Sequence, residues 1–233
     1  MRPMPKRQRG MGVIELMVAL LIGLIMSVAI AWFYLGSRAL SRVSEDVSRL
    51  QESGRGALEM MGMSVRQAGY RNNINASFNG TPLTGTNGAN GAPDTITVRF
   101  DAQEGGGELD CTGATVVTGA TVESIFTVDR TTNPPGLNCN GTRLIDNVED
   151  MQISYGIDAD HDGIIESYQS QPSATEFFFV AAVRVSLLLR GPSTMIAANK
   201  TQTLTYNGAP VQFTDGYLRQ AYNATFTVRP QAY

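Results

Sequence analysis

The chain has 233 residues, in which 18 lysines and arginines face 21 aspartates and glutamates, for a formal net charge of −3. This balance disfavours a basic groove, so no nucleic-acid partner is expected. A single histidine disfavours a zinc site, and the sequence contains no GxSxG, P-loop or HExxH motif that would indicate an enzyme.

Residues 16–35 form an almost uninterrupted apolar run. About 20 helical residues, at about 1.5 Å of rise each, cover the roughly 30 Å hydrocarbon core of a bilayer, so we expect one membrane-spanning helix. Arg2, Lys6, Arg7 and Arg9 precede the run, with no acidic residue among the first ten. The positive-inside rule therefore predicts a cytoplasmic amino terminus and export of the rest of the chain.

Glu15 places a carboxylate at the start of this apolar run. A charge there is costly in lipid unless a group outside the segment neutralises it, which points to assembly with another molecule. Two simpler interpretations stay open. The triplet Ala29-Ile30-Ala31 resembles the cleavage site of an ordinary secretory signal, and a plain single-pass anchor would let Glu15 reach the interface.

A regular stripe continues beyond the apolar run. Its apolar or small members recur in steps of three and four at Leu40, Val43, Val47, Leu50, Gly54, Ala57, Met61, Val65 and Ala68. This spacing predicts a long helix, to about residue 70, that buries one face. We expect that face to pack on the chain's own head. A heptad dimer is disfavoured because the stripe is short and Gly54 replaces a bulky side chain.

The remaining residues predict one β-rich head. Residues 71–93 are rich in Asn, Gly, Thr and Ser, which favours a loop. Strands are expected at residues 95–100, 121–128, 151–157, 177–189 and 224–228, with short ones near Val116 and Leu204. The run 177–189 is apolar enough for a central strand, with a helix as the alternative. The predicted fold class is α+β, a long helix laid across an antiparallel sheet.

Cys111 and Cys139 are the only cysteines, and both fall in stretches rich in Gly, Thr and Asn that predict connections. On the exported side of a membrane we expect them to form a disulfide. Two free thiols, or part of a metal site, are the alternatives.

An acidic motif, Asp158-Ala159-Asp160-His161-Asp162-Gly163-Ile164-Ile165-Glu166, suggests calcium as a cofactor. The expected ligands are the carboxylates of Asp158, Asp160 and Asp162, the backbone carbonyl of Ile164, and Glu166 directly or through water. Gln169 occupies the twelfth place, where an EF-hand has its glutamate, and a strand is predicted just before the motif, so a true EF-hand is not expected. A solvated Asp/Gly turn without an ion is the alternative.

The amino-terminal residues Gly10-Met11-Gly12-Val13-Ile14-Glu15, with the basic leader and the apolar helix, resemble the class III signal of type IV prepilins. The resemblance implies that a prepilin peptidase cleaves between Gly10 and Met11 and that the new amine of Met11 is methylated. It also implies that Glu15 pairs with the terminal amine of a neighbouring subunit and sets the register of assembly. Met11 departs from the Phe that major pilins usually have there.

Several later blocks resemble the PilW group of minor pilins. They are residues 66–70, 146–152, 183–190, 218–219 and 225–228. The resemblance implies a type IV pilin-like fold with four parts: a leader peptide (1–10), a transmembrane and polymerisation helix (11–36), its amphipathic second half (37–70) and a periplasmic β-rich head (71–233).

The function implied is that of a minor pilin that primes or caps a type IV pilus, and not that of an enzyme. The implied partners are other minor pilins and the major pilin, the prepilin peptidase, the inner-membrane assembly platform, and membrane lipid before assembly. The subunit would begin in the inner membrane and end in a cell-surface pilus. A J-type minor pseudopilin of a type II secretion system is the first alternative, and a membrane-anchored, calcium-dependent adhesion module is the second.

Overall fold

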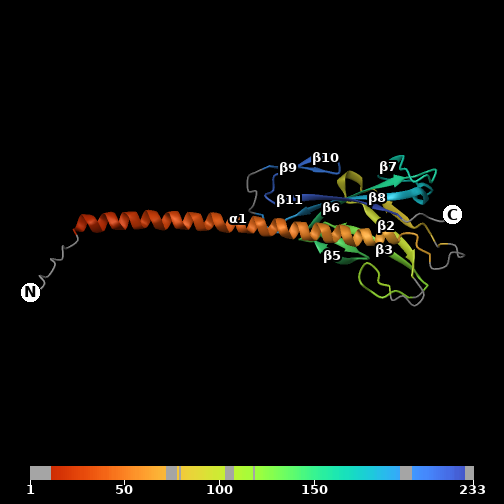
Figure 1. The fold of residues 1–233 in the computed structure, drawn as a ribbon, viewed down its shortest axis with the longest axis horizontal. Coiled ribbons are helices and arrows are strands. Elements are labelled where there is room, and N and C mark those ends of the chain that lie inside the picture. The colour runs from red at the N-terminus through yellow and green to blue at the C-terminus, as the bar shows by residue number, and fades with distance from the viewer. Residues whose placement is uncertain are drawn as a thin grey trace, which may run out of the picture. The chain divides into compact units, whose positions relative to one another are not determined.

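The computed structural model describes residues 12–71, 78, 80–102, 108–117, 119–194 and 201–228 (Figure 1). The chain divides into two compact units, Met1–Glu45 and Asp46–Tyr233.

One helix, α1 (Val13–Gln67), accounts for nearly all the described residues of the first unit and continues into the second. Its first part is long and apolar enough to cross a membrane, and apolar side chains such as Leu20 and Phe33 are exposed. The helix ends three residues earlier than predicted. Gly69 adopts a left-handed backbone (φ +71°) and its N–H donates to the carbonyl of Arg99, which turns the chain out of the helix.

Among the described residues of the second unit, the strands form two antiparallel sheets and a hairpin. The larger sheet has the strand order β1 (Leu83–Thr86), β2 (Thr95–Asp101), β3 (Thr121–Asp129), β4 (Gly136–Cys139) and β5 (Thr142–Asp146). The second sheet has the order β11 (Arg219–Thr227), β8 (Val180–Arg190), β6 (Val148–Ile157) and β7 (Ser167–Gln169). Strands β9 (Gln202–Tyr206) and β10 (Ala209–Phe213) form the hairpin, and two short 3₁₀ helices are η1 (Ala89–Gly91) and η2 (Glu176–Phe179).

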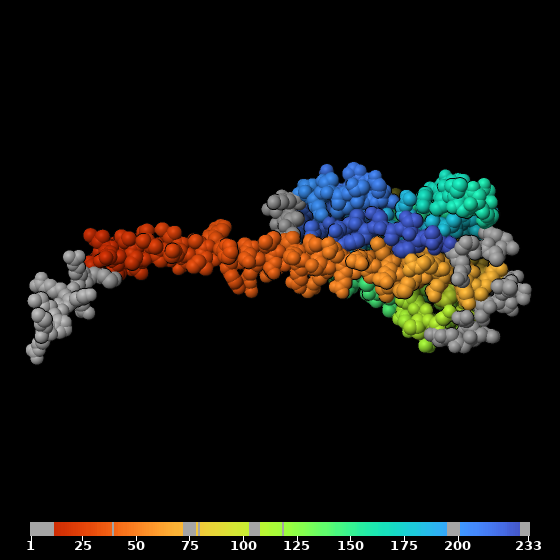
Figure 2. Space-filling view, viewed as in Figure 1, coloured from red at the N-terminus to blue at the C-terminus, as the bar shows by residue number. Residues whose placement is uncertain are grey.

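The core of the second unit lies between α1 and the sheets. From Leu50 onward the predicted stripe is buried, and Met61 and Val65 are fully enclosed with Phe126 and Leu187. Figure 2 shows the region of β11, in dark blue, lying directly along the second part of the helix. The predicted α+β class, a helix packed on an antiparallel sheet head, is confirmed. Leu40 is the exception in the stripe, because its side chain is exposed.

The central position of β8 is also confirmed, because it pairs with β11 on one side and β6 on the other. Its start was predicted wrongly. Phe177, Phe178 and Phe179 belong to η2, and reciprocal hydrogen bonds between Ser173 and Glu176 favour a turn before the strand begins.

Three other expectations need correction. The predicted loop 71–93 contains β1 and η1, and β1 takes its register from β2. Cys139 lies in β4 and not in a connection. Val116 belongs to no strand, and only an isolated bridge joins Leu109 to Thr115 beside it. The sequence pattern also missed β4, β5, β7 and β10, which are short and are stabilised by their neighbours in the sheet rather than by an apolar period of their own.

Candidate functional site

The amino-terminal site is only partly within the described residues. Gly10 and Met11, the predicted cleavage site and methylated amine, lie outside them. Glu15 stands in the first turn of α1 with an exposed side chain, and the N–H of Leu16 donates to the carbonyl of Gly12 at 3.2 Å. A carboxylate in the first turn is favoured by the helix dipole and leaves the acid available to another molecule.

The helix that carries Glu15 is consistent with a lipid environment. The side chain of Ser27 donates a hydrogen bond to the carbonyl of Gly23 at 2.8 Å, so its hydroxyl is satisfied within the helix. A polar group in a bilayer needs such an internal partner, because the hydrocarbon offers none.

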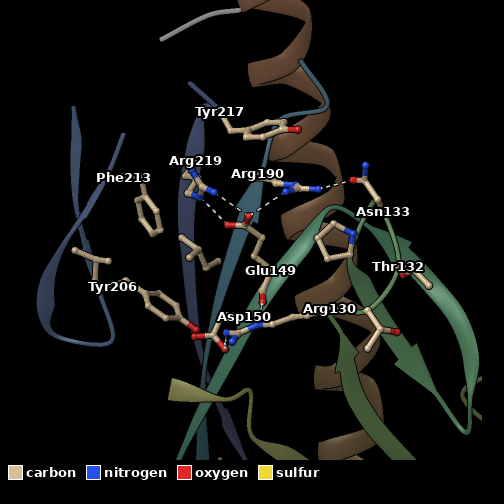
Figure 3. Close-up of a pocket in the computed structure, with 14 residues that line it drawn as sticks. Arg130, Thr132, Asn133, Glu149, Asp150, Arg190, Tyr206, Phe213, Tyr217 and Arg219 are labelled. Atoms are coloured by element: carbon tan, nitrogen blue, oxygen red, sulfur yellow. Dashed lines mark hydrogen bonds and ion pairs between the residues drawn. The ribbon is translucent and has the colours of Figure 1, made fainter. Parts of the chain in front are cut away.

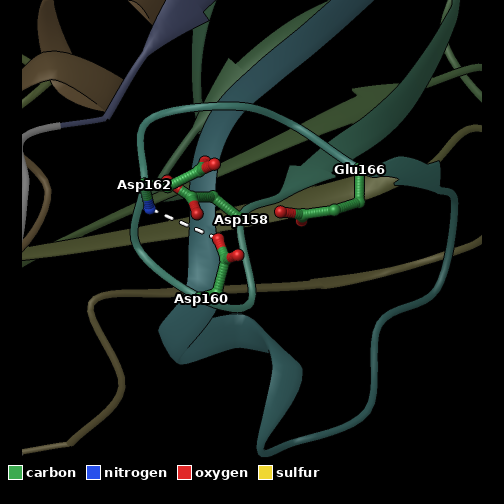
Figure 4. Close-up of side chains that lie close together, drawn as sticks. All are labelled: Asp158, Asp160, Asp162 and Glu166. Carbon is green, nitrogen blue, oxygen red and sulfur yellow. Dashed lines mark hydrogen bonds between the residues drawn. The ribbon is translucent and has the colours of Figure 1, made fainter.

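The acidic motif forms the loop between β6 and β7, and the structure brings its four predicted carboxylates together. Ligand oxygens of Asp158, Asp160, Asp162 and Glu166 all lie within 4.8 Å of one another. Figure 4 shows the three aspartates turned toward a common centre and Glu166 facing them from the far end of the loop. This cluster could hold a metal ion. Ile164, the predicted carbonyl ligand, lies in the same loop with an exposed side chain.

Hydrogen bonds within the loop orient these carboxylates. Asp158 accepts from the N–H of Gly163 at 3.0 Å, and Asp162 accepts from the N–H of Ile164 at 2.7 Å. Glu166 accepts from the N–H of Ala159 at 3.0 Å, which closes the loop across its ends. Gly163 has φ +87°, a conformation that permits the sharp turn and that other residues rarely adopt.

The two cysteines form the expected disulfide, with their Cα atoms 6.2 Å apart and a sequence separation of 28. Cys139 is fully buried in the core, whereas Cys111 is partly buried against it. The bond therefore ties the irregular segment around Cys111 to β4.

A cleft of about 700 Å³ lies over the carboxyl end of β8, and sequence analysis did not identify it (Figure 3). We call it the arginine cleft. It is lined by Arg130, Thr131, Thr132, Asn133, Pro135, Glu149, Asp150, Leu188, Arg190, Tyr206, Val211, Phe213, Tyr217 and Arg219. These residues come from the turn after β3, from β6 and β8, and from the segment that runs from the last residue of β9 to the first residue of β11.

Glu149 is the centre of this cleft. Its carboxylate accepts two hydrogen bonds from Arg219, at 2.6 and 2.9 Å, and lies 3.5 Å from Arg190. Asp150, the next residue, pairs with Arg130 at 2.7 Å. Each of these arginines therefore has a carboxylate partner. The charged groups of the cleft form ion pairs that connect its strands.

Arg219 is the most enclosed of these arginines, with a side chain only 4% exposed. Its guanidinium stacks 4.0 Å from the ring centre of Phe213 and also pairs with Asp215. The hydrogen bonds from Arg219 hold the pKa of Asp215 down to about 2, because they stabilise the charged carboxylate. The signal available in the sequence was the presence of Glu149, Arg190 and Arg219 in three separate PilW-like blocks.

Two family models match separate parts of the chain. The family model described as Type IV Pilus-assembly protein W matches residues 116–230, which include the whole arginine cleft. The model of the prokaryotic N-terminal methylation motif matches residues 5–31.

Among solved structures, the chain is similar to a type IV-like pilin from Thermus thermophilus. The two share 18% sequence identity with a TM-score of 0.53, over 79% of this chain and 98% of that chain. At this identity the similarity establishes the fold alone. No curated protein matches this chain in sequence.

Proposed function

Because this chain belongs to the type IV pilins, with a prepilin-type amino terminus and a head of the Type IV Pilus-assembly protein W family, we propose that it is a minor pilin that primes or caps a pilus. The observation that carries the proposal is the combination of Glu15, in the first turn of a long apolar helix, with a PilW-type head.

The helix supports such a role physically. In our proposal its apolar part leaves the inner membrane for a bundle of equivalent helices, so one apolar environment replaces another at little hydrophobic cost. Glu15 then pairs with the methylated amine of Met11 on the next subunit. That pair is strong in a low dielectric, and an unpaired charge there is costly, so it sets the axial register.

The partners follow from this assembly. We propose that the prepilin peptidase releases residues 1–10, that the inner-membrane platform extracts the subunit from lipid, and that other minor pilins and the major pilin lie above and below it in the fibre. The four basic residues of the leader support a cytoplasmic amino terminus with the head in the periplasm.

The families and the fold are those of structural pilins. We therefore propose a structural subunit and not a catalyst. The arginine cleft supports this, because its arginines are paired with carboxylates and its buried contacts connect strands.

Mass spectrometry of the purified native amino terminus tests the proposal directly. We expect N-methylated Met11. A chain that begins at Trp32 would indicate an ordinary secretory signal, and a retained Met1 would indicate a simple anchor. Either result would overturn the pilin role.

A second experiment isolates the role of Glu15. Glu15→Ala should leave peptidase cleavage intact and reduce recovery of the protein in sheared surface fibres. Glu52→Ala is the matched control, since it removes an exposed acid from the same helix. Normal incorporation of the Glu15 variant would contradict the register role.

Absence of the wild-type protein from fibres, together with loss of enzyme secretion on deletion, would indicate a J-type pseudopilin instead. Normal fibres after deletion, with adhesion lost, would indicate an adhesion module.

A further inference from the structure

Asp158 is a buried acid with one oxygen that lacks a partner. Asp158 directly follows β6 and is only 6% exposed, and its Oδ2 accepts a hydrogen bond from the N–H of Gly163. Its Oδ1 is enclosed, and no hydrogen bond to it is found among the described residues. A buried carboxylate oxygen without a partner is unfavourable, because it loses water and receives nothing in exchange. The geometry therefore calls for a positive ligand at this oxygen.

Three further carboxylates lie close to the carboxylate of Asp158. Asp160, Asp162 and Glu166 are exposed, and their ligand oxygens lie within 4.8 Å of the ligand oxygen of Asp158 and of one another. Each is held by a backbone N–H of the same loop, including the bond from Asp162 N–H to Asp160 at 3.3 Å. Four carboxylates held this close repel one another unless a cation lies between them.

The donor set indicates which cation. All four groups are carboxylates, which hard cations prefer. Calcium accepts six to eight oxygens in a flexible arrangement, whereas magnesium demands a near-ideal octahedron. The loop is irregular, with positive φ at His161 and Gly163, so it fits the flexible coordination of calcium better than the octahedron of magnesium.

We propose that Asp158, Asp160, Asp162 and Glu166 bind one calcium ion, with the unpartnered Oδ1 of Asp158 as its innermost ligand. The site differs from an EF-hand because strands, and not helices, flank it. The ion would join the end of β6 to the start of β7. It would also stabilise η2, because the N–H of Asp158 donates to the carbonyl of Phe179 at 2.9 Å.

Calorimetric titration of the full chain in detergent micelles with calcium chloride, at a constant excess of magnesium chloride, tests this site. We expect one calcium per chain with a Kd of about 10⁻⁴ to 10⁻³ M, the range of extracellular calcium modules. The melting temperature should rise with calcium and return on addition of a chelator.

Asp160→Asn with Asp162→Asn is the informative variant. Asparagine retains an oxygen that can accept the loop N–H bonds, so the fold is preserved while two ligand charges are lost. We expect at least about tenfold weaker binding, because affinity depends on ligand charge. Glu52→Gln with Glu59→Gln removes the same charge from exposed positions of α1 and should bind calcium like the wild type.

Two results would overturn the proposal. One is no saturable binding by natively folded wild-type chain up to about 10 mM calcium, well above the expected Kd range. The other is unchanged affinity in the Asp160/Asp162 variant, which would place any bound calcium elsewhere.

Discussion

Arg219 donates two hydrogen bonds to the carboxylate of Glu149, at 2.6 and 2.9 Å, although 70 positions separate the two residues in sequence. The pair joins β11 to β6 across β8, and Arg190, at the end of β8, contacts the same carboxylate. This charged network connects three strands of one sheet. The arrangement of these strands should therefore depend on the network.

Replacement of Arg219 by Met should therefore destabilise the head by about 3 kcal/mol, because Glu149 would keep only its longer contact with Arg190. Urea unfolding of the full chain in detergent, followed by near-ultraviolet circular dichroism, measures the change. Arg99→Met is the control, since its partner Glu123 is more exposed and such pairs contribute less than about 1 kcal/mol. Equal losses in the two variants would contradict the structural importance of the network.

Two glycines of α1 should respond oppositely to alanine. A Cβ at Gly54 would lie 2.6 Å from the ring of Tyr222 on β11, whereas a Cβ at Gly56 would meet nothing within 4 Å. Gly54→Ala should therefore destabilise by about 1–3 kcal/mol through overpacking. Gly56→Ala should stabilise by up to about 1 kcal/mol through helix propensity. Thermal melts of the two variants compare the signs directly, and the same sign for both would contradict the close packing of α1 on β11.

Loss of the disulfide should destabilise the head. Cys111→Ala removes the bond but leaves the fully buried sulfur of Cys139 in place. For a sequence separation of 28 residues, the chain-entropy model gives about 3–4 kcal/mol. Reduction of the wild type should reproduce the loss, and reduction of the variant should add nothing. Unchanged stability of the reduced wild type would show that the bond is dispensable.

Acid should weaken the hydrogen bonds that Glu176 makes at the start of η2. Hydrogen bonds from Gln169 and Ser173 lower the pKa of Glu176 from 4.5 to about 2, so the unfolded chain binds the proton more readily. The contribution of Glu176 is therefore complete above pH 4.5 and is lost as the pH falls toward 2. Glu176→Gln removes this titration, and its stability should fall less steeply over that window. Parallel profiles for variant and wild type, measured by thermal melting, would contradict this role.

The sequence by itself determined the parts of this protein that depend on local patterns. The apolar run with Glu15 at its start and the stripe from Leu50 to Ala68 are local features of a single helix, and the acidic motif places its four carboxylates within nine consecutive residues. The longer strands followed for the same reason, since side-chain alternation or a continuous apolar run marks each of them.

Only the tertiary structure decided the rest. The short strands β1, β4 and β5 take their register from neighbours, and the ring of Tyr222 over Gly54 explains a glycine that local propensity disfavours. The arginine cleft unites residues far apart in sequence, and the enclosure of Asp158 depends on how β6, η2 and the loop meet. Charge pairing and burial depend on which residues are neighbours in space, so no local sequence pattern predicts them.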